Sequence, residues 1–234
     1  MAAKPVTSEI RGAVALARLD DGKANAISES LIEALHAHLD VAESQAGAVL
    51  LTGRPGMLSG GFDLTVMRGG GGAEAVRRLV QAGAELFVRF IEFPKPIVVA
   101  ATGHAVAAGA LTLLSADRRI GAAGDFKIGL NEVGVGMTLP VFAVELARHR
   151  LSVRHLHRAV NEATLYAPHE AVDAGYLDRV VPADQLEAEA LAEASRMAAY
   201  PQPGFGATKQ RLHAQLAETI RGTLDADLKQ LLGV

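Results

Sequence analysis

The segment KPIVVAATGHAVAAGALTLLSADRRIG (95–121) decides the fold class, because it places three buried elements in one short stretch. IVVAATG (97–103) is a short apolar run after FPKP (93–96), whose prolines end the preceding helix, and it predicts a buried strand. AAGALTLLSAD (107–117) is apolar on all sides, which predicts a central buried helix. RRIGA (118–122) follows as another short strand. This alternation indicates an α/β domain.

Upstream of this segment the same alternation is present. AVALARL (13–19) and AVLLTG (48–53) are strand candidates, and each is followed by turn residues. A helix over roughly residues 74–91 precedes FPKP. Ser28 can cap an earlier helix whose apolar residues share one face: Leu31, Ile32, Leu35 and Leu39.

Downstream, the pattern becomes mostly helical after the short strand FKIG (126–129). Thr138 is expected to cap a helix with Pro140 in its first turn, and Ser152 to cap the next one. Gly175 should end a short helix over 168–175, before a last strand in LDRVVP (177–182). Two final helices are expected over 184–199 and 204–231. We therefore expect a core of residues 1–183 and a helical C-terminal region of residues 184–234.

Composition excludes several classes of function. The chain has 234 residues, 50% of them hydrophobic and 21% charged, and its net charge of -3 gives no case for binding nucleic acid or an anionic membrane. Cysteine is absent, so disulfides and thiolate chemistry are excluded. The N-terminal MAAKPVTSEIRG lacks the apolar stretch of a secretory signal, and no apolar run reaches membrane-spanning length. We expect a soluble, cytoplasmic protein.

Three further features carry no chemistry of their own in this interpretation. The glycine tract 69–72 lacks the Gly-Lys-Ser/Thr ending of a phosphate loop and is expected to be a flexible linker. Ser59 lacks the G-x-S-x-G elbow of a hydrolase nucleophile. The histidines are spaced so that helical neighbours fall on different faces, and no metal site is expected.

Two glycine-containing segments are candidates for ligand contact. LSGGFD (58–63) allows a ligand to approach the main chain closely, although an ordinary tight turn is the more common use of such glycines. GHAVAAGAL (103–111) leads from a buried strand into a buried helix whose free N–H groups attract negative charge, although its small residues also suit tight helix packing. If each segment presents one N–H group, the two together make an oxyanion hole.

The stretch GLNEVGVGM (129–137) supplies a candidate base, Glu132. A glutamate in a loop is usually solvated. Here the apolar neighbours Leu130, Val133 and Val135 favour a buried carboxylate. Burial would raise the pKa of Glu132 and make it a better general base.

Five segments, in this order and spacing, make the chain resemble the crotonase, or enoyl-CoA hydratase/isomerase, superfamily. They are KANAIS (23–28), VLLTGRPGMLSGGFDLTVM (49–67), KPIVVAATGHAVAAGALTLLSADRRIG (95–121), FKIGLNEVGVGM (126–137) and EAVDAGYLDRVVP (170–182). The resemblance implies a crotonase-like spiral of strand–strand–helix units with a helical C-terminal region that forms trimers. It also implies an acyl-CoA ligand and an enzyme that stabilises a thioester enolate.

Carried over by position, the resemblance assigns a role to each part of the site. The oxyanion-hole donors would be the backbone N–H groups of Phe62 and Ala108, and the base would be Glu132. The resemblance places the CoA and acyl contacts at Lys23, Ala24, Ala26, Gly60, Gly61, Asp63, Leu64, Leu111 and Asn131. It implies no cofactor, because coenzyme A is part of the substrate.

One departure from the family pattern separates the possible activities. Hydratases of the family use a second glutamate where this chain has Leu111, and the family's three-glycine run is reduced to Ala107-Ala108-Gly109. Moving a double bond from C3–C4 to C2–C3 needs one base and an oxyanion hole. The chain is therefore most similar to single-glutamate 3,2-trans-enoyl-CoA isomerases of β-oxidation. A hydratase, which is a lyase, and a non-catalytic acyl-CoA-binding protein remain the alternatives.

The assembly is the last expectation. The resemblance implies a homotrimer or a dimer of trimers, without nucleic acid or membrane partners. An apolar run in the last helix suits either a subunit boundary or the cover of its own domain: Leu212, Leu216, Ile220, Leu224 and Leu228.

Overall fold

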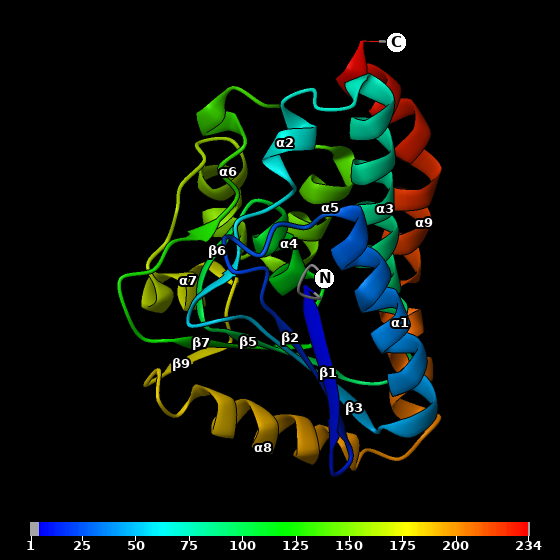
Figure 1. Cartoon of the computed structure of the whole chain (residues 1–234), viewed down its shortest axis with the longest axis vertical. Coiled ribbons are helices and arrows are strands. Elements are labelled where there is room, and N and C mark those ends of the chain that lie inside the picture. The colour runs from blue at the N-terminus through cyan, green and yellow to red at the C-terminus, as the bar shows by residue number, and fades with distance from the viewer. Residues whose placement is uncertain (1–4, 234) are drawn as a thin grey trace.

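A six-stranded sheet forms the centre of the protein, whose computed structural model describes residues 5–233 (Figure 1). The expectations about the extreme N-terminus fall partly on residues 1–4, which lie outside the described residues. Only the first two strands of the sheet pair antiparallel; the others are parallel. The strands lie in the order β1 (Val6–Arg11), β2 (Val14–Leu19), β3 (Ala48–Thr52), β5 (Ile97–Ala101), β7 (Arg118–Ala122) and β9 (Arg179–Val181).

Helices cover both faces of this sheet, which explains why its strands are apolar throughout. The helix α8 (Leu186–Ala198) runs beneath the strands in Figure 1, on the side opposite α4 (Ala108–Leu114). Along β2, Val14 and Leu16 contact the α8 layer, whereas the alternate residues enter the main core. That core also contains α1 (Glu29–Gln45) and α3 (Gly72–Glu92).

A second, smaller sheet stands beside the first. It consists of three parallel strands in the order β4 (Gly56–Ser59), β6 (Gly103–Val106) and β8 (Ile128–Gly129). β4 and β6 approach closely at Gly103, where a Cβ would lie 2.0 Å from the Gly56 carbonyl carbon. The sequence did not predict β4 or β6 as separate strands, because each is only four residues long.

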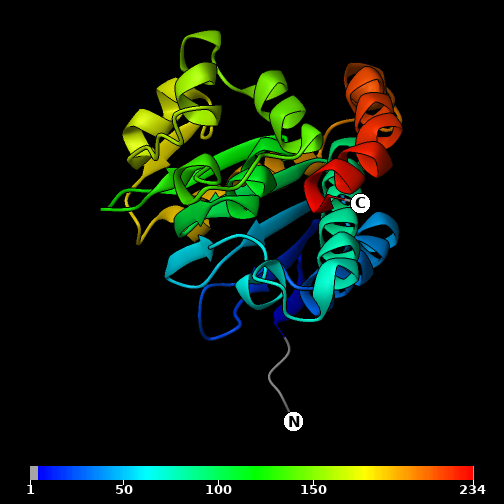
Figure 2. The ribbon, with the colours of Figure 1, turned by 90° about the horizontal axis from the view of Figure 1, so that it is seen from above.

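The C-terminal half is helical, as expected. It comprises α5 (Val141–Arg150), α6 (Val153–Val160), α7 (Pro168–Ala174) and α9 (Gly204–Leu232). The last helix packs along α3 and α5 of its own chain, and these helices gather on one side of the molecule in Figure 2. Leu216, Ile220 and Leu228 are buried, whereas Leu212 is 64% exposed. The apolar run of α9 therefore covers its own domain.

Two local predictions were wrong. The glycine tract is not a linker but a hydrogen-bonded turn between α2 (Leu64–Met67) and α3, where the Gly70 N–H donates to the Thr65 carbonyl (2.9 Å). Thr138 does not cap α5, because the helix begins at Val141 and Pro140 occupies the capping position. Pro140 therefore precedes the helix instead of lying in its first turn. Ser28 caps α1 as predicted, accepting from the Leu31 N–H (3.3 Å).

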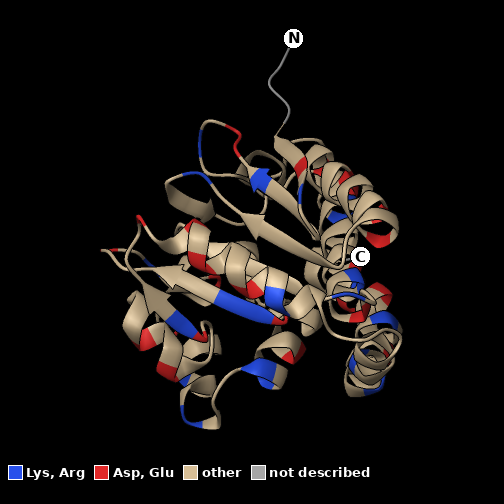
Figure 3. Cartoon of the chain, turned by 90° about the horizontal axis from the view of Figure 1, so that it is seen from below, with Lys and Arg blue, Asp and Glu red and all other residues tan. Residues whose placement is uncertain are grey.

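Charged residues are spread over the surface. In Figure 3, Lys and Arg alternate with Asp and Glu along the helices and do not gather on one face. Within residues 5–233, no helix is both long and apolar enough to cross a membrane.

Candidate active site

The candidate groups follow the C-terminal ends of the three strands of the small sheet. The segment Gly60–Phe62 follows β4, Ala107 and Ala108 follow β6, and Glu132 follows β8 after two residues. Because these strands are parallel neighbours, their C-terminal ends meet at one edge of the sheet. That edge is where open α/β folds bind ligands. The topology thus brings together the three groups that the sequence proposed separately.

The backbone of Phe62 is positioned by pairing with Ile27. The Ile27 N–H donates to the Gly61 carbonyl (2.8 Å), and the Asp63 N–H donates to the Ile27 carbonyl (3.2 Å). In such a parallel bridge the intervening residue turns its own N–H to the other side. Among the described residues the Phe62 amide has no hydrogen bond, so it is available to a ligand.

The second amide lies at the start of α4. Ala108 is the first residue of the helix, and the N–H groups of a first helical turn have no partner within the helix. Ala107, before it, has φ 53° and ψ -126°, a conformation that favours glycine. The Ala107 N–H donates to the Gly129 carbonyl (3.0 Å), which ties this turn to β8. This backbone conformation of Ala107 turns the chain sharply, so that α4 begins at the C-terminal end of β6.

The two turns touch each other. A Cβ on Gly61 would lie 2.8 Å from the Ala107 Cβ and 3.4 Å from the Ala108 nitrogen. A Cβ on Gly109 would lie 2.2 Å from the Ser59 carbonyl oxygen. Glycine is therefore required at both positions for the amides to converge. The approach of Gly61 to Ala107 and Ala108 brings the two segments together, whereas the contact of Gly109 with Ser59 also fits tight helix packing.

Asn25 is a supporting residue that sequence reasoning missed. It is fully buried at φ 49°, and its side-chain amide donates to the carbonyls of Leu19 (3.0 Å), Met57 (3.1 Å) and Leu58 (3.1 Å). Ser59 completes the link, because its hydroxyl donates to the Asn25 carbonyl (2.7 Å). Asn25 therefore holds β4 in place beside β2. The tolerance of asparagine for positive φ was the one signal available in the sequence.

Gly83 is a second residue that the sequence did not single out. It lies buried in the middle of α3, and a Cβ there would come within 2.4 Å of the Phe62 ring. The missing side chain provides the space into which the Phe62 ring packs. Gly83 thus fixes the side chain of the residue whose amide faces the site.

Glu132 has one oxygen inside the protein and no partner for it. Its Oε2 is buried without a hydrogen bond among the described residues. Burial raises the pKa of the carboxyl group, and the backbone amides of Glu132 and Asn131 oppose this only in part. Its carbonyl accepts the Met137 N–H (2.8 Å), which closes the loop around η1 (Val133–Val135). A buried carboxylate with raised pKa is suited to accept a proton near neutral pH.

The cause of this burial differs from the prediction. Leu130 is fully buried, but Val133 and Val135 are 42% and 63% exposed and point away from the core. The two valines therefore do not shield the Glu132 carboxylate from water as predicted.

The remaining predicted contacts surround the strand ends. Lys23 and Ala24 are exposed and Ala26 is half-buried, and the Ala24 carbonyl accepts the Gly60 N–H (2.8 Å). The Asp63 carboxylate accepts the Thr65 N–H (2.8 Å) at the start of α2, where Leu64 is 57% exposed. These residues form a rim next to Phe62.

On the inner side, two predicted contacts lie next to the candidate groups. Leu111 is 1% exposed, one helical turn after Ala108. Asn131 is half-buried beside Glu132.

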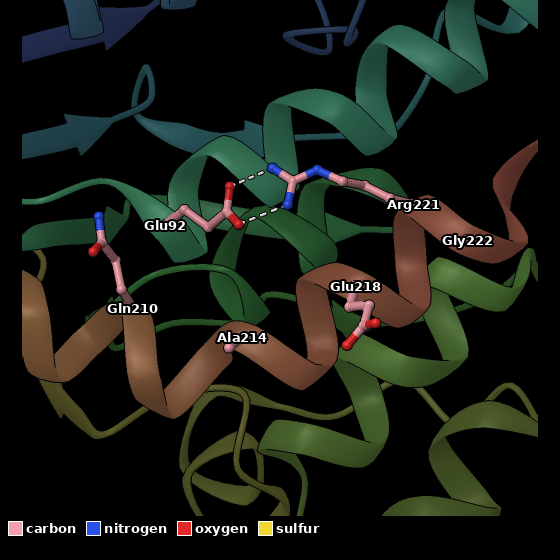
Figure 4. A pocket seen from close by; sticks show the side chains of 6 residues that line it. All are labelled: Glu92, Gln210, Ala214, Glu218, Arg221 and Gly222. Carbon is pink, nitrogen blue, oxygen red and sulfur yellow. Dashed lines mark hydrogen bonds and ion pairs between the residues drawn. The ribbon is translucent and has the colours of Figure 1, made fainter.

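A depression on the protein surface lies away from these residues. It has a volume of about 860 Å³, lies between the end of α3 and the outer face of α9, and contains none of the predicted site residues (Figure 4). The Arg221 guanidinium crosses it to the Glu92 carboxylate (2.7 Å). It is lined by residues of α3 and α9 alone, away from the strand ends that lead to Phe62, Ala108 and Glu132, so it is not the candidate active site.

Comparison with known proteins accounts for this arrangement. The family model described as "Enoyl-CoA hydratase/isomerase" matches residues 9–232 of the chain. The chain belongs to the enoyl-CoA hydratase/isomerase family. Its spiral of strands and helices is the crotonase fold of that family, as the sequence predicted.

Similar members of the family carry both parts of the family name. A crystal structure of an enoyl-CoA hydratase/isomerase family protein from Pseudomonas syringae is 43% identical, with a TM-score of 0.94 over 97% of this chain and 98% of that one. Human mitochondrial enoyl-CoA delta isomerase 1 is 29% identical over 94% of this chain and 74% of its own length. A putative enoyl-CoA hydratase from Thermus thermophilus is 31% identical over 87% and 82%.

Among residues 5–233, no group of three or more His, Asp or Glu side chains is placed to hold a metal ion. The chemistry that the site offers is that of one carboxylate and two backbone amides.

Proposed function

We propose that this protein is a 3,2-trans-enoyl-CoA isomerase, which moves a double bond of an acyl-CoA from C3–C4 to C2–C3. The observation that carries the proposal is a single buried carboxylate beside two free amides, with leucine at the position of the second carboxylate. Leu111 is 1% exposed and offers no proton. One base is sufficient for isomerisation but not for the orientation of a water molecule.

The proton transfers follow from this arrangement. Glu132 takes a proton from C2, and the electron pair of that C–H bond moves through the conjugated system to the thioester oxygen. The Phe62 and Ala108 N–H groups stabilise the negative charge on that oxygen. The protonated Glu132 then returns the proton at C4, which leaves the double bond between C2 and C3. Atoms and charge balance without a cofactor, so none is proposed beyond the CoA that the substrate carries.

The burial of Glu132 supports this role. A carboxylate with a raised pKa removes a proton more readily from carbon and is easier to reprotonate. Since the base must be ionised, activity should rise with pH through the pKa of Glu132. The exposed rim formed by Lys23, Ala24 and Leu64 is the proposed contact for coenzyme A, which is too large to be enclosed by the strand ends alone.

The test is an assay of the purified protein with a 3-enoyl-CoA, following the appearance of the conjugated thioester. Glu132→Gln keeps the size of the side chain and removes the base, and we expect it to lower kcat by roughly a hundredfold to ten-thousandfold. Glu218→Gln, in the depression of Figure 4, is the matched control and should keep wild-type activity. Equal rates for wild type and Glu132→Gln would exclude Glu132 as the base.

A hydratase is the second candidate, favoured by the name of the Thermus thermophilus relative. Here a polar group other than Leu111, or the substrate itself, would position the water. Rapid addition of water to a 2-enoyl-CoA, faster than isomerisation of the 3-enoyl-CoA, would establish this alternative. A non-catalytic acyl-CoA-binding protein would catalyse neither reaction and would show no Glu132-dependent deuterium exchange at C2.

The setting of this activity is part of the proposal. Shifting a double bond into conjugation prepares unsaturated acyl chains for β-oxidation, and we propose this role for the enzyme. We also propose a homotrimer or a pair of trimers. Sedimentation or light scattering of the purified protein would determine the number of subunits.

A further inference from the structure

Residues 163–166, in the connection between α6 and α7, lie against the end of β8. The Ile128 N–H donates to the Tyr166 carbonyl (3.0 Å), and the Tyr166 N–H donates to the Ile128 carbonyl (2.9 Å). Next to this pair, a Cβ on Gly129 would lie 2.9 Å from the Thr164 carbonyl oxygen. The connection is therefore fixed beside the chain just before the loop that carries the proposed base.

The same connection also contacts the chain after Glu132. A Cβ on Gly134 would lie 3.2 Å from the Cβ of Ala163, closer than the favourable carbon–carbon separation of about 3.5–4.0 Å. Gly134 is the middle residue of η1, and this turn closes on Glu132, whose carbonyl accepts the Val135 N–H (3.1 Å). Residues 163–166 thus contact the backbone on both sides of Glu132.

Ala163 has a backbone conformation that non-glycine residues seldom adopt. Its φ is 50°, and it is held there by a hydrogen bond from the Thr164 N–H to the Arg158 carbonyl (3.1 Å) and by the buried Tyr166 ring. Glycine would adopt this φ without strain, but it would lack the methyl group that faces Gly134. Backbone strain of this kind is concentrated at functional sites.

The position of Glu132 depends on the backbone that carries it. Its inner carboxylate oxygen has no hydrogen-bond partner among the described residues, so no side chain fixes the carboxylate from that side. A base that takes a proton at C2 and returns it at C4 has to stay within reach of both carbon atoms. A displacement of about 1 Å in a reacting group can lower a rate by roughly a hundredfold.

We propose that Ala163 is a positioning residue, whose methyl group supports the η1 turn and thereby sets the position of Glu132 relative to the substrate. The inference rests on the proposed function, since Glu132 is the proposed base. Ala163 acts through Gly134 and does not touch the substrate. The missing side chain at Gly134 allows the two segments to approach.

The experiment moves one methyl group across this contact. Gly134→Ala adds a methyl where there is no room for it, so the turn has to shift by a few tenths of an ångström. We expect kcat to fall on the order of tenfold with little change in KM. Ala163→Gly removes the support and should lower kcat by a smaller factor. In the double variant the methyl lies on the other side of the contact, and kcat should return close to the wild-type value.

A glycine in open space provides the matched control. A Cβ on Gly222 of α9 would meet no atom within 4 Å, so Gly222→Ala should keep the wild-type kcat. The backbone of Gly134 itself accepts alanine, because its φ is not positive. Thermal unfolding of each variant establishes that it is folded. A contact that contributes only to stability would change the melting temperature and leave kcat unchanged.

A second readout does not depend on turnover. Hydrogen exchange of residues 129–137 reports on the loop, in which the Met137 N–H donates to the Glu132 carbonyl (2.8 Å). We expect this segment to exchange faster in Ala163→Gly and to return to the wild-type rate in the double variant. Equal exchange in all variants would show that Ala163 does not support the turn.

The outcomes separate this inference from the proposed function. If Glu132→Gln abolishes isomerisation but Gly134→Ala keeps the wild-type kcat, the positioning role is wrong and the function stands. A double variant no faster than Ala163→Gly also overturns it, and this comparison holds even if Gly134→Ala does not fold. If wild type and Glu132→Gln turn over equally, the proposed function is wrong, and hydrogen exchange alone then tests the support of the turn.

Discussion

The loop of Glu132 and the helix α9 each contain a charged group with buried atoms. The charge on α9 has an oppositely charged partner, whereas the charge of Glu132 does not. Lys209 on α9 is 4% exposed, and its Nζ lies 2.5 Å from the Asp117 carboxylate. Asp117 also accepts the Ile97 N–H (2.8 Å), which joins α9 to β5. Within residues 5–233, Glu132 has no counter-charge of this kind and its inner oxygen has no hydrogen-bond partner.

This difference distinguishes a charge that stabilises the fold from a charge that can take part in a reaction. Burial lowers the pKa of Lys209, but Asp117 opposes this and holds the ion pair together. The pair fixes the position of α9 and is not available to a ligand. Burial raises the pKa of Glu132 without such compensation, so its proton affinity remains available for a reaction. A buried charge with a partner indicates architecture, and one without a partner indicates a site.

The largest expected effect comes from breaking the pair. Lys209→Met keeps the length of the side chain and leaves the Asp117 carboxylate without its cation, which should lower the free energy of unfolding by about 3–5 kcal/mol. Lys229→Met is the control, because Lys229 pairs with Asp225 on the exposed face of the same helix. That variant should lose less than about 0.5 kcal/mol. Urea unfolding measures the free energy of unfolding of both variants. Similar losses would show that the buried ion pair stabilises the fold no more than the exposed one.

A second effect concerns pH and His213, which lies on α9 near Lys209. Burial, followed by the charges of His149, Lys209 and Arg150, lowers the pKa of His213 to about 4. The folded pKa is below the unfolded value of about 6.5, so the unfolded state takes up the proton first as pH falls. Stability should therefore fall between about pH 6.5 and pH 4, by up to about 3 kcal/mol from this residue.

The measurement is the pH dependence of unfolding for wild type and His213→Asn. Acidic groups titrate in both proteins, so only the difference between the two curves reports on His213. We expect this difference to change across the window and to be constant above pH 7. Parallel curves throughout would show that His213 does not resist protonation.

The smallest expected effect is the change in stability when Glu132, the charge without a partner, is replaced. Glu132→Gln removes a buried charge without a partner, so it should stabilise the fold by about 1 kcal/mol at pH 8. Because the folded pKa of Glu132 is raised, its cost is present above that pKa and disappears as pH falls toward the unfolded value. The advantage of the variant should disappear in the same direction. Thermal unfolding at pH 8 and pH 5 measures it, and a less stable Glu132→Gln at pH 8 would contradict the idea of an uncompensated base.

Much of the architecture could be predicted from local patterns. The buried strands 48–53 and 97–103, the apolar helix after them and the cap at Ser28 follow from periodicity and turn chemistry. The elements that were missed are short: β4, β6 and α2 each have four residues, and β1 has six. So few residues show no period, and their conformation is set by pairing with neighbours.

For the site, the sequence by itself determined the chemical groups. It offered Glu132 as the base, the glycine turns as the source of free amides, and Leu111 in place of a second carboxylate. These are properties of residue type and order, which the chain carries whether or not it is folded. They sufficed to indicate the family and to favour one reaction over another.

Only the tertiary structure decided how these groups meet. Parallel pairing of β4, β6 and β8 brings Phe62, Ala108 and Glu132 to one edge, and the contact of Gly61 with Ala107 allows it. The burial of the inner Glu132 oxygen does not come from its flanking valines, which are exposed. The distances between these groups and the burial of Glu132 depend on how distant segments pack. A local sequence pattern therefore could not predict them.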